Sequence, residues 1–310
     1  MRIAIIGQQD FGKAVLEAFL RRGDTVAGVF CAPEKAGAKP DPLAVAADAA
    51  GLPVYRLPSL KTAEARDTLA KLGVDLGVMA YVLQFVPQDF VAIPRHGMIQ
   101  YHPSLLPRYR GPSSINWPII RGDVRTGLTI FRPTDGLDEG PVLFQREVAI
   151  GPDDTLGSVY FDHLFPMGVA ALVEAADHVV NLRYDEVSQD EALASYEGWC
   201  RTEEARINWH NHVDTVYNLI RGCNPAPGAW TSFRGQKLQL FDARKHLFHR
   251  FADVKGAVGA VAAVGPESML VTAQGGHIEV FKLRYGEGKK ITAPQWCAEV
   301  GLSPGTVLGD

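Results

Sequence analysis

Paired cysteines, a phosphate-binding loop and an excess of positive charge are all missing from this 310-residue chain. The four cysteines are scattered without a C-x-x-C pair, so we expect neither a metal site nor a disulfide framework. No G-x-x-x-x-G-K-[ST] run occurs, and we therefore expect no ATP requirement. The net charge is −4, which gives no electrostatic reason to expect a nucleic-acid partner.

Long apolar runs are also scarce at the start of the chain. The opening MRIAIIG is apolar over only a few residues before Gln8. Such a run is too short for a signal segment or a membrane-spanning helix, and it is typical of a buried strand. We therefore expect no membrane association, and the unpaired cysteines favour a reducing, cytoplasmic location.

The first turn lacks one glycine of the dinucleotide-binding pattern. Residues 7–12 read GQQDFG, with Gln9 where G-x-G-x-x-G has its middle glycine. A side chain at that position hinders close approach of a pyrophosphate to the backbone. The turn therefore predicts an ordinary strand-to-helix connection and no NAD(P) requirement.

What the chain does contain, over its first half, is a regular alternation of strands and helices. This alternation predicts an α/β fold with a doubly wound, mostly parallel sheet. Ligands on such sheets bind beyond the carboxyl ends of the strands. The predicted strands are 1–7, 25–31, 53–57, 74–81, 97–101, 127–131 and 142–150, and the predicted helices are 12–22, 43–50, 62–72 and 156–180.

Composition changes near residue 183. We predict a first, catalytic domain over 1–183, a polar and irregular linker over 184–206, and a second domain over 207–310. The second domain has short β-type runs punctuated by Gly, Pro or charge, which predicts a smaller, β-barrel-like structure.

The stretch YHPSLLPRYRG, residues 101–111, carries the strongest chemical signal. Pro103 and Pro107 restrict the loop that follows His102. Asp138 lies in the later run TDGLDEGP, which also follows a predicted strand. A histidine and a carboxylate that meet at one sheet edge can move protons during attack on a carbonyl, and Asp138 would orient the imidazole and favour its charged form.

Plainer interpretations exist for each of these residues. His102 could be incidental to a surface loop, and Asp138 could simply form a turn. Arg108 and Arg110 could meet an anionic ligand or could belong to an ion-paired turn. The proline-restricted loop and the two arginines that follow His102 favour a catalytic site.

These motifs resemble those of the folate-dependent formyltransferases, which use 10-formyltetrahydrofolate. The resemblance rests on H-P-S-L-L-P-x-x-R-G and a downstream G-x-D-x-G loop, and it runs through nearly the whole chain. PDPL (40–43), YEG (196–198), INW (207–209) and PGAWT (227–231) are most similar to the N-terminal hydrolase domain of 10-formyltetrahydrofolate dehydrogenase. The resemblance implies a formyltransferase-type Rossmann-like domain followed by a barrel-like C-terminal domain.

The resemblance also implies catalytic residues. The family's trio is an Asn, a His two residues later and the loop Asp. His102 and Asp138 match, whereas the Asn position holds Gln100. Glutamine keeps an amide donor but is one methylene longer. In the hydrolase relatives this position is apolar.

Two segments match the family's folate contacts, which implies 10-formyltetrahydrofolate as co-substrate and tetrahydrofolate as product. One corresponds to the loop that holds folate in the hydrolase domain, and the other to the folate-contacting run of the transferases. The implied folate-binding residues are Gln84, Phe85, Val86, Ser104, Leu105, Leu106, Pro107 and Asp138.

The formyl acceptor stays open at this point. Water would make the protein a hydrolase that releases formate and tetrahydrofolate. A small amine would make it an N-formyltransferase acting on an amino sugar or a hydroxyornithine-type amine; methionyl-tRNA is disfavoured by the acidic charge balance. The overall likeness favours the hydrolase, and the polar Gln100 favours a transferase. A non-catalytic folate-binding protein is the third alternative, and nothing in the residue pattern indicates an oligomeric state.

Overall fold

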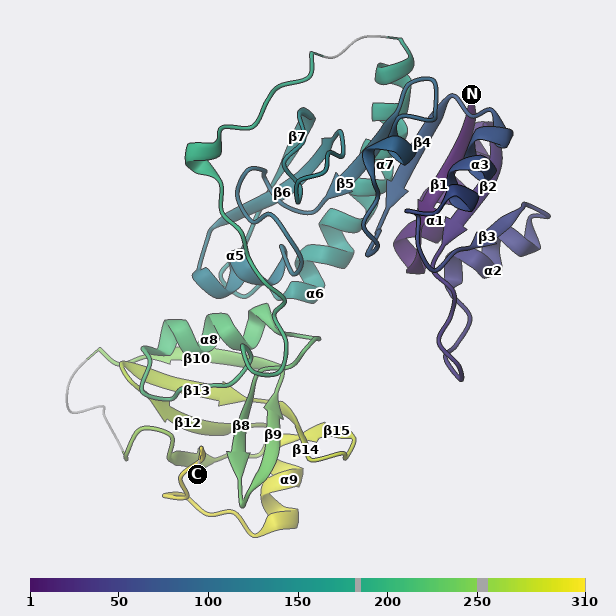
Figure 1. The fold of residues 1–310 in the computed structure, drawn as a ribbon. Helices are drawn as coiled ribbons and strands as arrows, with labels where there is room; N and C mark the ends of the chain where they lie inside the picture. Colours follow the sequence, from purple (N-terminus) through teal and green to yellow (C-terminus); the bar gives the residue numbers. More distant parts are fainter. Residues whose placement is uncertain (182–184, 250–255, 310) are drawn as a thin grey trace. The chain divides into compact units, whose positions relative to one another are not determined.

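A computed structural model describes residues 1–181, 185–249 and 256–309. The chain divides into two compact units, which are described separately (Figure 1). Unit 1 consists of Met1–Gly111, Gly127–Val148 and His163–Tyr196, and unit 2 of Pro112–Thr126, Ala149–Asp162 and Glu197–Asp310. The domain limits at 183, 184 and 310 lie outside the described residues and stay predictions.

Unit 1 is built on a seven-stranded sheet in the order β3-β2-β1-β4-β5-β6-β7. The pairs from β3 to β5 are parallel, and β6 runs antiparallel to β5. The predicted doubly wound, mostly parallel sheet is confirmed. The strands are β1 (Arg2–Gly7), β2 (Thr25–Cys31), β3 (Val54–Arg56), β4 (Leu76–Ala80), β5 (Met98–His102), β6 (Arg125–Phe131) and β7 (Val142–Ala149).

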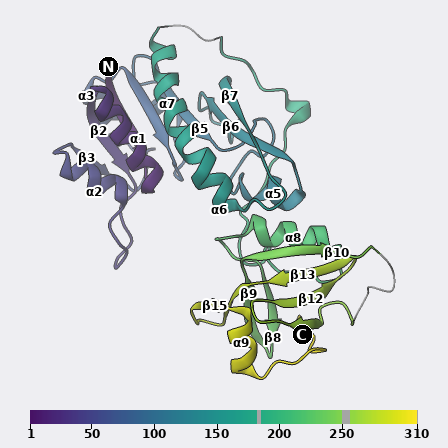
Figure 2. The same cartoon turned by 180° about the vertical axis from the view of Figure 1, so that it is seen from behind.

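Helices cover both faces of this sheet, as the burial of successive side chains along β1 requires. Ala4 and Ile6 pack with residues of α3 and α4 on one face. Ile3 and Ile5 are equally buried and point to the opposite face, which α1 and α7 cross (Figure 2). The helices that begin or end in unit 1 are α1 (Gln9–Arg22), α2 (Pro42–Ala49), α3 (Ala63–Leu72), α4 (Gln88–Val91) and α7 (Phe165–Val180).

The predicted helix over 156–180 consists of three successive pieces. They are α6 (Leu156–Ser158), a π-helical turn (Val159–Leu164) and α7. By length and composition alone, the whole stretch could cross a membrane, with a mean hydropathy of 1.3, although core helices pass the same test. Gly168 of α7 lies against the ring of Tyr101 on β5, where a Cβ would clash. One side of α7 therefore belongs to the core of unit 1.

In the turn after β1, the backbone packs closely against the end of β4. A Cβ on Gly7 would collide with the carbonyl oxygen of Ala80 on β4. Gln9, at the position where the dinucleotide pattern has glycine, adopts a left-handed φ of 63°, which is strained for a side chain. Its N–H donates to the Asp41 carboxylate at 2.9 and 3.0 Å. The protein's own carboxylate thus satisfies this N–H at the start of α1.

Unit 2 contains two four-stranded antiparallel sheets, ordered β10-β13-β12-β11 and β15-β14-β9-β8. Both contribute to one apolar core that includes Trp209, Leu238, Val271 and Trp296. The predicted second, smaller β-rich domain is confirmed. Its elements are α5 (Asn116–Arg121), α8 (Val213–Gly222), β8 (Trp230–Phe233), β9 (Gln236–Leu240), β10 (Ala243–Leu247), β11 (Val261–Val264), β12 (Met269–Ala273), β13 (Gly276–Val280), β14 (Lys282–Tyr285), β15 (Lys290–Thr292) and α9 (Ala293–Val300).

Candidate active site

The loop that carries His102 is fixed by a buried hydroxyl on the neighbouring strand. His102 is the last residue of β5 and lies opposite Thr129 of β6. The Thr129 hydroxyl donates to the carbonyl of Ser104 at 2.7 Å. It also accepts from the Leu106 N–H at 3.1 Å and from the Gln145 amide at 2.8 Å. The chain leaves β5 in one defined direction as a result.

Both ring nitrogens of His102 face protein acceptors. Nε2 lies 2.8 Å from the carbonyl oxygen of Tyr109. Because a carbonyl only accepts, Nε2 must carry a hydrogen. Nδ1 lies 3.5 Å from Oδ2 of Asp138, and the two side chains are only 7% and 10% exposed. The two predicted catalytic residues therefore come together in a nearly buried pair.

The Asp138 loop joins β6 to β7 and closes on itself. The Arg132 N–H donates to the Pro141 carbonyl at 2.9 Å, and a Cβ on Gly140 would collide with the carbonyl oxygen of Arg132. Asp138 has a left-handed φ of 56°, a conformation that aspartate tolerates better than most residues. The Gly111 N–H donates to its Oδ2 at 2.9 Å, so backbone groups hold the carboxylate.

This geometry suits proton transfer. With Nε2 held as a donor, the doubly protonated ring directs its second N–H from Nδ1 toward Asp138. In the neutral ring, Nδ1 instead presents a lone pair to that carboxylate. Oδ1 of Asp138 makes no hydrogen bond within the described ranges, which leaves it available to a ligand. Near burial strengthens each of these electrostatic interactions relative to water.

Gln100 lies two residues before His102 on the same strand. Alternate residues of a strand point to the same face, so Gln100 and His102 share one face of β5. The Gln100 amide makes no hydrogen bond to any residue that the structure describes. The predicted third member of the trio is therefore near the pair and has a free donor.

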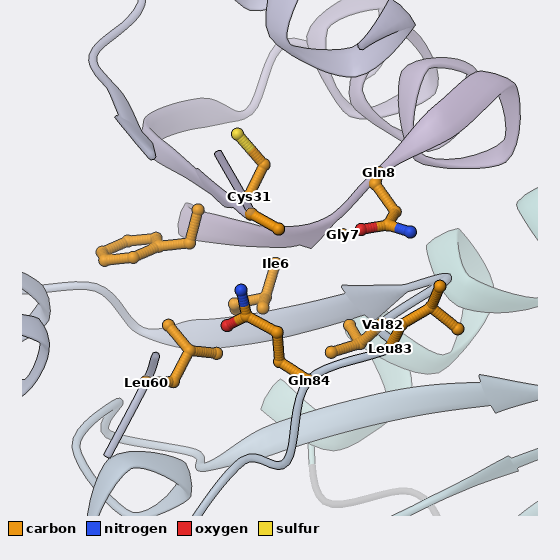
Figure 3. Close-up of a pocket in the computed structure, with 10 residues that line it drawn as sticks. Ile6, Gly7, Gln8, Cys31, Leu60, Val82, Leu83 and Gln84 are labelled. Carbon is orange, nitrogen blue, oxygen red and sulfur yellow. The ribbon is translucent and has the colours of Figure 1, made fainter. Parts of the chain in front are cut away.

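The loop after β4 borders a narrow cleft at the carboxyl ends of β1, β2 and β4 (Figure 3). This is where the strand order reverses direction, the usual ligand position in such sheets. Gln84 lines the cleft and donates to the Leu57 carbonyl at 2.9 Å. Phe85 is about half exposed, whereas the side chain of Val86 is buried in the core. Val86 can thus offer a ligand little beyond its backbone.

The other predicted folate residues lie within the His102 loop. Ser104 is fully buried, and its hydroxyl donates to the Arg108 carbonyl at 2.7 Å. Leu106 is buried, while Leu105 and Pro107 are half-buried. The hydroxyl of Ser104 is therefore committed to the loop itself. The binding roles of these residues stay predictions.

Arg110 is ion-paired, which agrees with the interpretation of residues 108–110 as an ion-paired turn. Its side chain is fully buried and its guanidinium contacts Glu191 at 2.6 and 2.9 Å. It also donates to Gln189 and to the hydroxyl of Tyr196. The hydrogen bond that Arg110 donates to Glu191 is the largest influence that raises the pKa of Arg110. The same contact lowers the pKa of Glu191.

Two further residues of the site escaped prediction. The Tyr109 carbonyl holds His102, and the Gln189 amide donates to the carbonyls of Asp138 and Gly140 at 2.8 and 2.7 Å. A backbone carbonyl leaves no mark on the sequence. Gln189 lies in a polar segment without periodicity, so no pattern singled it out.

A metal site does not emerge from the described part of the chain. Across residues 1–181, 185–249 and 256–309, no three His, Cys, Asp or Glu side chains gather to hold an ion. All four cysteines are free thiols.

Comparison with known proteins places this geometry in context. The formyl transferase family model matches residues 1–175, and the model of the formyl transferase C-terminal domain matches residues 200–301. The human mitochondrial 10-formyltetrahydrofolate dehydrogenase is 36% identical over 307 residues, which cover 96% of this chain and 33% of that protein. The chain thus spans about a third of the length of these dehydrogenases.

Two other comparisons cover different lengths. The methionyl-tRNA formyltransferase of Geobacter metallireducens is 32% identical over 314 residues, covering 100% of this chain and 99% of that protein. The structure of HypX from Aquifex aeolicus in complex with tetrahydrofolic acid has a TM-score of 0.68 at 18% identity, covering 96% of this chain and 47% of that one. At this identity the structural likeness concerns the fold.

The family models together cover most of the sequence, and the resemblance inferred from the HPSLLP and GLDEG motifs is confirmed. On both grounds, this chain belongs to the formyl transferase family.

Proposed function

We propose that this protein catalyses attack of water on the formyl group of 10-formyltetrahydrofolate, giving formate and tetrahydrofolate. The observation that carries the proposal is the nearly buried His102–Asp138 pair, 3.5 Å apart at the end of β5, in a chain of this family. The 36% identity to 10-formyltetrahydrofolate dehydrogenase supports the choice of folate. The scheme uses no NAD(P), ATP or metal.

Attack begins at the carboxylate. Oδ1 of Asp138 accepts a proton from water as the water oxygen bonds to the formyl carbon. The carbonyl oxygen then becomes an oxyanion, to which the free Gln100 amide donates. One such donor typically contributes about 3–4 kcal/mol, or about 10²–10³ in rate.

Collapse of the tetrahedral intermediate needs a proton on the departing nitrogen. Nε2 stays bonded to the Tyr109 carbonyl, so the doubly protonated His102 supplies this proton to N10 from Nδ1, and the proton taken up by Asp138 then restores Nδ1. The C–N10 bond breaks, N10 gains one hydrogen and the formyl carbon leaves as formic acid, which ionises to formate. Water's two hydrogens are thereby accounted for, one on N10 and one on the acid.

The folate would bind along the cleft beyond β1 and β4. Backbone groups of Gln84, Phe85 and Val86 suit the donors and acceptors of a pterin edge, because a few fixed polar groups in an apolar cleft give orientation. Leu105 and Pro107 would pack against the rest of the molecule. In the present conformation the cleft is narrow, so we expect the 82–86 loop to move when folate binds.

A small amine is the second candidate acceptor, and the observation that favours it is Gln100. The family resemblance implies an apolar residue at this position in the hydrolase relatives, whereas a free amide resembles the arrangement that it implies for the transferases. In this alternative reaction the amine nitrogen attacks in place of the water oxygen, and Asp138 removes a proton from the amine. An N-formyl amine then leaves in place of formate.

One assay separates these proposals. Tetrahydrofolate formation from 10-formyltetrahydrofolate is measured without acceptor and then with amino sugars, hydroxylamines and charged methionyl-tRNA. Formate release that no amine accelerates supports the hydrolase, and amine-dependent formation of a formyl amide supports the transferase. Tight folate binding without either product would overturn both and favour a non-catalytic binding protein.

A further inference from the structure

The segment 187–196, called the strap below, lies against both catalytic loops. Its composition predicts part of a linker, yet it belongs to unit 1 and its backbone and side chains bond to the rest of that unit along its length. The N–H and carbonyl of Val187 pair with those of Val142 on β7 at 2.9 and 2.8 Å. At its other end, Ser195 donates its N–H to the Pro107 carbonyl at 3.1 Å and accepts from the Arg110 N–H at 2.8 Å.

Gln189 is the residue of the strap that reaches both loops with one side chain. Its amide nitrogen donates to the carbonyls of Asp138 at 2.8 Å and Gly140 at 2.7 Å. Its amide oxygen accepts from Nε and Nη2 of Arg110 at 3.1 and 2.9 Å. All the hydrogen-bonding capacity of the amide is therefore used, two bonds toward the Asp138 loop and two toward the His102 loop.

Together these bonds close a ring that starts and ends at the catalytic pair. His102 bonds to the Tyr109 carbonyl, and the Tyr109 N–H donates to the hydroxyl of Ser195 at 2.8 Å. Arg110, the next residue, bonds to Gln189, and Gln189 bonds to Asp138. The separation of His102 and Asp138 is thus set directly by their mutual contact and again by the strap.

The ring holds two backbone conformations that need support. Tyr109 and Asp138 both have left-handed φ values, 58° and 56°. Such conformations cost free energy and persist only where the surrounding structure enforces them. Arg110 adds a second requirement, because a fully buried guanidinium must keep its partners.

We propose that Gln189 is a positioning residue that sets the geometry of the His102–Asp138 pair, an inference that rests on the proposed function. It touches no reacting atom; it acts through the two loops. A displacement of about 1 Å at a catalytic group can cost about 10²-fold in rate. Gln189 should therefore influence kcat far more than folate binding.

The test is the isosteric substitution Gln189→Glu. A glutamate still accepts from Arg110, but it presents a carboxylate oxygen to two carbonyls where the glutamine donated. The link to the Asp138 loop is lost while the link to the His102 loop stays. Gln189→Met, of similar length and without polar groups, provides a second variant if the glutamate prevents folding.

Unit 2 offers a matched control. The Gln239 amide nitrogen donates to the Pro227 carbonyl at 2.9 Å, and its oxygen accepts from Nε of Arg284 at 2.8 Å. Gln239 is buried, so Gln239→Glu makes the same chemical change at an Arg–Gln–carbonyl bridge that lies entirely in unit 2. Melting temperatures show whether the two substitutions disturb folding equally.

Two readouts are measured, kcat and KM for 10-formyltetrahydrofolate and the ring-nitrogen NMR shifts of His102, assigned by comparison with His102→Ala. We expect Gln189→Glu to lower kcat about 10–100-fold with KM changed less than about threefold, and to shift the His102 signals. We expect Gln239→Glu to change neither. A kcat equal to that of Gln239→Glu, or unmoved His102 signals, would overturn the positioning role.

The NMR readout also separates this inference from the proposed function. If the wild-type protein shows no His102-dependent turnover, the proposed function fails. The His102 signals of Gln189→Glu then decide the positioning role by themselves, because they report ring environment without catalysis.

Discussion

Both units of this protein contain histidines beside carboxylates, and the pair His102–Asp138 of unit 1 differs from the pair His246–Glu279 of unit 2 in a way that distance alone does not reveal. In unit 1, Nδ1 of His102 lies 3.5 Å from Asp138, with the side chains 7% and 10% exposed. In unit 2, Nε2 of His246 lies 2.8 Å from Glu279, with the side chains 52% and 22% exposed. The shorter pair is the more exposed one.

What distinguishes the unit 1 pair is its enclosure. The second nitrogen of His102 is held by a carbonyl, and Asp138 is held by the Gly111 N–H and by a strained backbone. His246 lies on β10, at the edge of its sheet, opposite His277 of β13. An exposed ion pair is screened by water and contributes little, whereas a nearly buried pair with fixed partners can hold a proton in a defined place.

The largest difference in kcat between the two pairs should appear when each imidazole is removed in turn. We expect His102→Ala to lower kcat about 10³-fold, since positioned acid–base groups contribute about 10²–10⁴. His246→Ala should leave kcat within about twofold. Steady-state tetrahydrofolate formation measures both.

Folate binding serves as the control for this comparison. Titration should give similar Kd values for wild type and both variants, because His102 is expected to act on bound substrate. Wild-type turnover in His102→Ala would contradict the catalytic assignment, and a large loss in His246→Ala would remove the contrast between the two pairs.

Removing the charge of each carboxylate should have the next largest effect. Asp138→Asn keeps the side-chain length, and asparagine tolerates the left-handed backbone at this position. Without the carboxylate the proton acceptor is lost, and we expect kcat to fall about 10²-fold. Glu279→Gln should leave kcat unchanged in the same assay.

Asp135→Asn is the local control, since Asp135 lies in the same loop. A comparable loss of turnover in Asp135→Asn would mean that loop charge in general, and not the Asp138 carboxylate beside His102, supports the reaction.

The sequence predicted which two residues form the unit 1 pair, but it did not predict the groups that surround and hold them. His102 and Asp138 each follow an apolar strand, and this position singled them out. Because β6 runs antiparallel to β5, the ends of the two strands lie at opposite edges of the sheet, and the loop after β6 brings Asp138 back to His102. The supports could not be predicted in this way. Every residue type has a backbone carbonyl, so the sequence could not indicate that the Tyr109 carbonyl holds His102. Gln189 reaches the loops from a segment that has no periodicity.

Side-chain direction was the other limit. Val86 matches a folate-contacting position in the family, yet its side chain packs in the core. Similarly, α9 went unpredicted because its sequence, APQWCAEV, is short and follows a β-type run; the Thr292 hydroxyl that accepts from the Gln295 N–H at 3.4 Å marks its start. Short helices of this kind depend on packing, here of Trp296 in the unit 2 core, more than on local pattern.

A moderate effect should follow from loosening the enclosure while leaving the pair intact. Thr129→Val retains the shape of the side chain but leaves the Leu106 N–H and the Ser104 carbonyl without their partner. Buried groups left unpaired cost about 1–3 kcal/mol each, so we expect a lower free energy of unfolding and reduced turnover. Urea denaturation and the kinetic assay measure the two effects.

Thr231→Val in unit 2 is the matched control, because the buried Thr231 hydroxyl accepts from the indole N–H of Trp209 at 3.1 Å. It should lower stability less and leave kcat unchanged. Equal losses of turnover would show that global stability, and not the fixed His102 loop, sets the rate.

The smallest effect concerns the exposed pair and its dependence on pH. The hydrogen bond from Ser268, at 2.7 Å, is the largest influence that lowers the pKa of Glu279, and His246 adds to it. A carboxylate with a lowered folded-state pKa stabilises the protein above its unfolded value of about 4.3 and loses that contribution as pH falls through the folded value. Wild type should therefore exceed Glu279→Gln in stability at pH 7 by less than about 1 kcal/mol.

Urea midpoints of wild type and Glu279→Gln between pH 7 and pH 3 should converge as the carboxylate becomes protonated. A constant difference would show that Glu279 acts through shape or neutral hydrogen bonding. Convergence, together with unchanged kcat, would mean that the shorter of the two His–carboxylate contacts affects only the acid stability of unit 2. The longer contact would then owe its chemical importance to the backbone groups and the strap that enclose it, because those are what the exposed pair lacks.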